Sequence, residues 1–148
     1  MPPKAYFERM VLPTYEEFLA DNTNVRRAML ACMATHHLMD AIGMEASRKA
    51  TDVYKELETQ CPALNTVKAV CLVAKHIVPT QSGFKKYTID HVKRGRGAAF
   101  SDGTYFNDGT TFADSPETIV LSPSQTDISD VSKALDAAVD YFRGKLDL

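Results

Sequence analysis

The stretch NVRRAMLACMATHHLMD, residues 24–40, decides the fold of this chain. Asn24 is a good helix N-cap, because its side-chain oxygen can accept a hydrogen bond from a backbone N–H of the first turn. The inner positions then follow helical spacing, at Val25, Met29, Cys32, His36 and Met39. No charged residue occurs between residues 28 and 34. A helix that is apolar over most of its circumference lies at the centre of a fold, and we expect this one to end or bend at Gly43.

A second apolar helix is predicted over residues 63–78, ALNTVKAVCLVAKHIV. Pro62 fits its first turn, where the missing N–H of proline costs little, and Pro79 ends it. The apolar positions recur at intervals of three and four residues: Leu64, Val67, Cys71, Ala74 and Val78. Because each of the two helices needs an apolar partner, we expect them to pack against each other.

Two more polar helices are predicted from their caps. Thr14 followed by Glu17 fits a capping box, which opens a helix over residues 14–22. Ser47 is the expected cap of a charged helix over residues 48–60. The inward side of that second helix consists of Val53, Tyr54 and Leu57.

After Pro79 the pattern changes to the alternation that is typical of strands. Residues 84–92 predict one strand, and residues 118–121 predict another. Arg94–Gly97 is expected to form a flexible turn between strands. The segment YFNDGTTF, residues 105–112, places Asp-Gly between aromatic residues, which is typical of a β-hairpin.

A closing helix follows, with Ser129 or Asp127 as its expected cap. Its apolar stripe consists of Val131, Leu135, Ala138, Val139 and Phe142. This order of elements predicts an α+β fold, mainly α: a helical bundle with a small antiparallel β-sheet or hairpin insertion before the C-terminal helix. The chain has 148 residues and is expected to form one domain, 1–148, with a helical core (14–79), a β-hairpin region (80–123) and a closing helix (124–146).

Composition excludes several classes of protein. With 45% hydrophobic and 24% charged residues, the chain can bury a core and is not a disordered tail. No apolar stretch approaches the length of a membrane span, and no apolar segment follows Lys4 as it would in a secretory signal. The three cysteines are expected to be reduced thiols in a cytoplasmic protein. The sequence contains no complete catalytic or cofactor motif, and no cofactor is predicted.

The charge is distributed unevenly along a chain whose formal net charge is -2. Residues 98–148 are strongly acidic, whereas residues 81–97 form a basic patch of Lys85, Lys86, Lys93, Arg94 and Arg96. A basic patch can bind nucleic acid, but it can equally pair with the acidic C-terminal part or form a solvated strand face. Four aromatic residues could stack on bases or form the core of the sheet: Tyr87, Tyr105, Phe106 and Phe112.

His36, His37 and Asp40 form a polar group on the first apolar helix. The spacings of three and four residues place both histidines on a face with Asp40. Imidazole and carboxylate at this spacing could bind a metal, with His36 and Asp40 as candidate ligands, or act as base and orienting group. The alternative is a core histidine whose tautomer Asp40 fixes.

Lys75 and His76 form a second polar group, near the end of the other apolar helix. A buried charge needs a partner, because desolvation alone costs several kcal/mol. We therefore expect His37, Asp40, Lys75 and His76 to converge at one end of the helical core. These four residues are the candidate catalytic group.

Several short motifs resemble those of a class of bacterial and phage proteins. They are Asn24-Val-Arg-Arg27, His37-Leu-Met-Asp40, Cys61-Pro-Ala-Leu64 and Ala74-Lys-His76. Together they resemble the HEPN class of helical bundles, over most of residues 14–145. The resemblance implies a helical bundle with an added hairpin, often dimeric. Many members of the class are ribonucleases or partners in toxin–antitoxin and phage-defence systems.

The chain departs from the ribonuclease motif of that class, in which an Arg precedes a His by four to six residues. Here Arg26 and Arg27 precede His36 and His37 by nine to eleven positions, which weakens the expectation of a nuclease. The leading hypothesis is a small cytoplasmic binding or regulatory protein, a homodimer that can also bind another protein. The alternatives are a metal-dependent or RNase-type hydrolase that uses His36 or His37 with Asp40 and His76, and a nucleic-acid binder that uses the basic patch.

Overall fold

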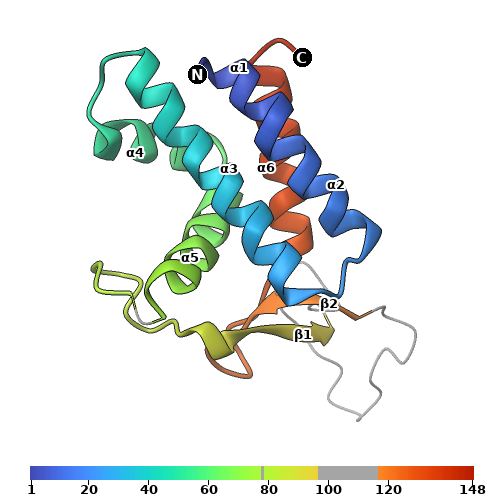
Figure 1. The fold of residues 1–148 in the computed structure, drawn as a ribbon. Helices are drawn as coiled ribbons and strands as arrows, with labels where there is room; N and C mark the ends of the chain where they lie inside the picture. Colours follow the sequence, from blue (N-terminus) through green and yellow to red (C-terminus); the bar gives the residue numbers. More distant parts are fainter. Residues whose placement is uncertain (78, 97–116) are drawn as a thin grey trace.

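The computed structural model describes residues 1–77, 79–96 and 117–148 (Figure 1). The fold is mainly α with a small antiparallel sheet, which confirms the predicted fold class. The helical elements are α1 (Pro3–Tyr6), the π-helical segment η1 (Phe7–Val11), α2 (Leu12–Ala20), α3 (Val25–Glu45), α4 (Ala50–Gln60), α5 (Ala63–His76), the 3-10 helix η2 (Ile89–His91) and α6 (Val131–Lys145). The strands are β1 (Val92–Arg96), β2 (Glu117–Leu121) and β3 (Ser129–Asp130).

Helix α3 is the central element of the molecule. It packs against α1, α2, α4, α5 and α6, and Figure 1 shows it running between the α1–α2 rod and α5. Its inner face enters the core with Cys32, Leu38 and Met39 fully buried. The core also takes large side chains from the other helices and from β2: Phe7, Phe18, Leu57, Leu64, Ile119, Leu135 and Phe142. The prediction of a central helix over the stretch that includes residues 24–40 is therefore confirmed.

Some helix boundaries agree with the sequence and others do not. Asn24 caps α3, with its Oδ1 accepting from the backbone N–H of Arg27 at 3.1 Å. The predicted capping box at Thr14 is wrong, because the helical rod already begins at Pro3 and the Thr14 hydroxyl donates to the carbonyl of Met10. A side chain inside a helix has no free N–H to cap, so it bonds to a preceding carbonyl instead.

Three further cap predictions are corrected. Gly43 lies within α3, where a Cβ would lie 3.4 Å from Cγ2 of Val53 on α4. Ser47 lies in the α3–α4 connection with φ 52°, and α4 begins after Lys49. Asp130 caps α6 through its Oδ1, 3.0 Å from the N–H of Lys133, in place of Ser129 or Asp127.

The sheet has the order β1-β2-β3 and is antiparallel throughout. Val92 pairs with Leu121, and Val120 pairs with Asp130. The predicted strand over residues 84–92 is wrong except for its last residue, because the chain turns from 82 to 86 and forms η2 before β1 begins at Val92. Arg94 to Arg96 belong to β1 and not to a turn. The hairpin predicted over residues 105–112 lies outside the described residues.

The backbone is sterically constrained at two positions, Gly95 and Ile77. Gly95 faces β2 so closely that a Cβ would lie 2.8 Å from Cγ2 of Val120. Ile77 ends α5 with φ 62° and ψ -52°, a strained conformation for a β-branched residue. Among the described residues, every helix is too short or too polar to span a lipid bilayer.

Candidate functional site

The polar middle of α3 is built around Asp40. The hydroxyl of Tyr54, which α4 supplies, donates a hydrogen bond to Oδ1 of Asp40. The ring of His36 meets the Tyr54 ring edge-on, with centroids 5.1 Å apart and an interplanar angle of 88°. Sequence analysis placed Tyr54 on the inward side of its helix but gave it no role, because a hydrogen bond between residues on different helices has no signature in spacing.

Burial determines the protonation of both histidines. His36 is only 6% exposed, and desolvation lowers its pKa, against an opposing effect of Asp40. Burial also lowers the pKa of His37, and the positive charge of Lys75 adds to that shift. Both imidazoles are therefore neutral at pH 7. Nδ1 of His36 has no hydrogen-bond partner among the described residues.

The neighbouring hydroxyl and thiol groups also have shifted pKa values. Burial, followed by the charge of Asp40, raises the pKa of Tyr6. Burial and the hydrogen bond to Asp40 raise the pKa of Tyr54. Burial raises the pKa of the Cys71 thiol to about 11, although Lys75 acts in the opposite direction. These three groups are therefore protonated at pH 7.

Three of the four residues that were expected to converge act on one another electrostatically. Lys75 affects the pKa of His37, and so does Asp40. His76 is exposed on the last turn of α5 and shares no hydrogen bond, ion pair or ring contact with the other three in the part of the chain that is described. Within the same residues, Lys75 forms no ion pair with Asp40. The charges of Asp40 and Lys75 thus both act on His37, whereas no interaction joins His76 to these three among the described residues.

An open pocket of about 550 Å³ lies beside Asp40, between the start of the chain and the C-terminal half of α3. Figure 1 shows α1 alongside this half of α3, and the two elements are in contact. We call this pocket the α1–α3 notch. Its walls are formed by Pro2 and Tyr6 on one side and by His37, Asp40, Met44 and Glu45 on the other, with Met1 and Ala41 completing the lining.

The metal site that the sequence suggested lacks further ligands. Residues 1–77, 79–96 and 117–148 contain no group of three or more His, Cys, Asp and Glu side chains that could hold a metal ion. Zinc sites in proteins use three or four such ligands. His36 and Asp40 both contact Tyr54, but no third metal-ligating side chain joins them among those residues.

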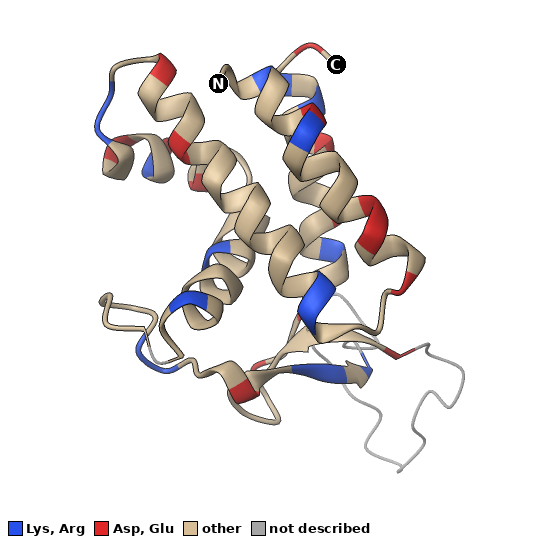
Figure 2. Ribbon diagram, viewed as in Figure 1, with Lys and Arg blue, Asp and Glu red and all other residues tan. Residues whose placement is uncertain are grey.

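The five residues of the basic patch are placed on different surfaces. Lys86 forms an ion pair with Asp127, with Nζ and Oδ2 2.9 Å apart, and its Nζ lies 4.9 Å from the centre of the Tyr87 ring. Arg94 donates from Nε to the carbonyl of Thr23 at 2.8 Å, on the side of the sheet that faces the helices. Lys85 is exposed in the turn before η2. In Figure 2, blue segments lie on β1 and on the chain before it.

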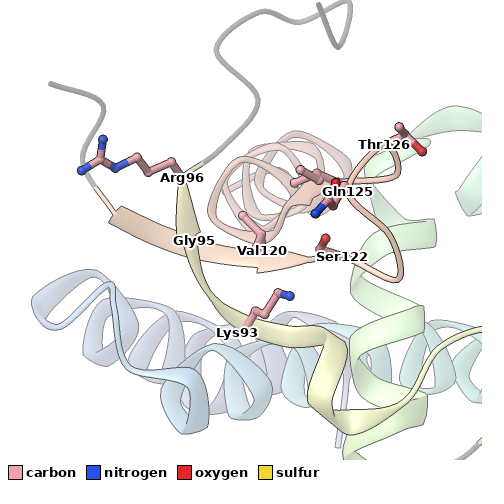
Figure 3. A pocket seen from close by; sticks show the side chains of 8 residues that line it. Lys93, Gly95, Arg96, Val120, Ser122, Gln125 and Thr126 are labelled. Carbon is pink, nitrogen blue, oxygen red and sulfur yellow. The ribbon is translucent and has the colours of Figure 1, made fainter. Parts of the chain in front are cut away.

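Lys93 and Arg96 line a second hollow, also of about 550 Å³, on the outer face of the sheet. We call it the sheet trough; its lining includes Gly95, Val120, Ser122 and Gln125, with Thr126 and Ile128 beyond them (Figure 3). In Figure 3, Arg96 extends away from Ser122 and Gln125, at the opposite end of β1 from Lys93. Of the four aromatic residues considered for base stacking, Tyr87 packs against the core and the other three lie outside the described residues.

Comparison of the chain with protein-family models, with curated proteins and with solved structures finds no match.

Proposed function

We propose that this chain is a small binding and regulatory protein whose ligand site is the α1–α3 notch. One observation carries the proposal: His37 and Asp40, three residues apart on α3, line the same open pocket. A neutral imidazole offers one donor and one acceptor, and a carboxylate offers acceptors only. Pockets that combine apolar walls with a few polar groups of this kind are typical of small-ligand sites.

A hydrolase that uses His37, Asp40 and His76 has less support, because His76 does not line the notch and shares no hydrogen bond with the other two among the described residues. The Cys71 thiol, on which the charges of Lys75 and Asp40 act, is buried, and its raised pKa keeps it protonated. A nucleic-acid binder also has less support, since Arg94 and Lys86 are already bonded within the chain. Binding in the notch needs none of these groups to move.

The proposal includes a homodimer in the cytoplasm. Leu30 on α3 is 40% exposed, and a second copy that covered it would bury its apolar surface. All three cysteines are unpaired, as expected in a reducing compartment. Light scattering should give twice the mass of the chain, and Leu30→Glu should reduce it to one; a monomeric parent protein would contradict the homodimer.

The helical architecture agrees with the HEPN-like resemblance of the sequence, and a role beside a partner in a toxin–antitoxin or phage-defence system belongs to the same proposal. This part rests on the short motifs around His37, Asp40 and His76. Copurification of one defined partner protein with the tagged chain would support it, and recovery of the chain alone would count against it.

Binding in the notch can be tested with six-carbon probes: hexylamine, 1-hexanol and hexanoate. The Met44 methyl and His37 ring signals in carbon–proton NMR spectra should shift and saturate with at least one probe. Ala41→Phe should abolish the shifts by filling the notch, whereas Ala20→Phe, at an exposed position on α2, should leave them unchanged. No saturable shift with any of the three probes would refute the proposed function.

A further inference from the structure

We infer that the α1–α3 notch selects a primary-amine ligand: an ammonium group attached to an apolar body of a few carbons. The inference rests on the proposed function, because it names the ligand class of the same pocket. It stands on the charge of the lining, on the hydrogen bonds of Asp40 and on the apolar walls.

The charge of the lining favours a cation. Among the lining residues, Asp40 and Glu45 carry carboxylates, none is a lysine or arginine, and Met1 carries an α-amino group. Lys75 influences His37 through space but lies on α5, outside the lining. An ammonium ion that enters the notch therefore meets two carboxylates, whereas a carboxylate ligand would be repelled by them.

Asp40 is held in position to receive a donor. The Tyr54 hydroxyl bonds to Oδ1, and no described residue donates to Oδ2. A carboxylate can accept several hydrogen bonds, and an ammonium group carries three donors. His37 lies one helical turn from Asp40. The ring nitrogen that carries no proton in neutral His37 is a second acceptor for the same ammonium group. Charge-assisted bonds of this kind are shorter and stronger than neutral ones.

The remaining lining suits the body of such a ligand. Met44 is 81% exposed, the largest exposed fraction among the large apolar side chains described. Together with Pro2 and the ring of Tyr6 it forms apolar walls around the carboxylates. The aromatic ring also favours a cation over a neutral group of the same size. An alkyl chain would cover the Met44 side chain while its ammonium end reaches Asp40.

The three six-carbon probes share one alkyl chain and differ only in the head group. They therefore distinguish binding in the notch from selectivity for an amine. Dissociation constants from the NMR titration at pH 7 and low salt should show hexylamine binding about tenfold more tightly than hexanol, with hexanoate the weakest. Asp40→Asn retains an acceptor for the Tyr54 hydroxyl but removes the charge, and it should erase most of that preference. Glu45→Gln should reduce the preference by about twofold, because an exposed pair contributes less.

The matched control is Glu16→Gln, which removes an exposed carboxylate of α2 outside the notch and should leave all three affinities unchanged. If hexanol binds as well as hexylamine, or if Asp40→Asn keeps the preference, the amine inference is wrong while the notch remains a binding site. If hexanoate binds best, the charge argument is wrong. If no probe binds, the proposed function itself is lost.

Discussion

The α1–α3 notch and the sheet trough have similar volumes but opposite chemistry. Carboxylates and a neutral imidazole line the notch, whereas Lys93 and Arg96 line the trough. Different elements also form the two pockets. One wall of the notch is the outer face of the central helix α3, whereas the floor of the trough is a three-stranded sheet at the end of the bundle. The pocket that is lined by carboxylates therefore lies on α3, the helix that packs against most of the other helices.

The largest expected effect tests this difference between the elements that form the two pockets. Leu38→Ala removes a fully buried side chain from the inner face of α3, and we expect it to lower the free energy of unfolding by about 3 kcal/mol. Val120→Ala removes a smaller side chain from the sheet and should cost about 1.5 kcal/mol. Urea unfolding of both variants measures the two values. Equal costs would mean that the sheet is packed as firmly as the helical core.

A somewhat smaller effect is expected at the floor of the trough. Gly95→Ala places a Cβ 2.8 Å from Cγ2 of Val120, a buried side chain with little rotational freedom, and should cost about 2 kcal/mol. In the double variant Gly95→Ala, Val120→Ala the added methyl finds space, so its cost should be clearly less than the sum of the single costs. Strict additivity in thermal or urea unfolding would show that the close approach is not the cause.

The smallest effect concerns the pH dependence contributed by the polar middle of α3. Because burial lowers the pKa of His36 in the folded state, the unfolded state binds more protons as the pH falls. The stabilisation is complete above about pH 6.5, the ordinary pKa of histidine, and is lost as the pH falls below it towards the folded-state pKa. The loss amounts to about 1.4 kcal/mol for each unit of pKa difference.

His36→Leu should therefore flatten the dependence of unfolding free energy on pH between about 7 and 5. His76→Gln, a change at an exposed histidine, is the control and should leave the slope as it is. An unchanged slope in the His36 variant would show that this residue is not the buried titrating group.

Much of the fold could be predicted from particular residues. Asn24 caps α3 as expected, Pro62 precedes α5, and the stripe from Val131 to Phe142 is buried on α6. Prediction failed where the local signal was ambiguous. Residues 84–92 alternate, yet Phe84 and Tyr87 pack against the helical core, and Phe84 lies under Lys68 with Nζ 5.2 Å from the ring centre. Only Val92 of that stretch therefore joins the sheet.

The candidate site was predictable only in part. Spacing on one helix brings His37 and Asp40 together on the notch wall, because residues three apart share a helical face. The contribution of Tyr6 and Glu45 to the notch, and of Tyr54 to Asp40, could not be predicted in the same way. Tyr6 and Tyr54 come from separate elements whose relative angles depend on packing.

The sequence by itself determined that α3 and α5 are apolar helices and that His37 and Asp40 lie on one face, because helical periodicity is a local property of the backbone. Only the tertiary structure decided that α1 and α3 together line a notch, that Tyr54 reaches Asp40, and that His76 does not line the notch. Those outcomes depend on how several helices fill one core at once, and no single stretch of sequence specifies them.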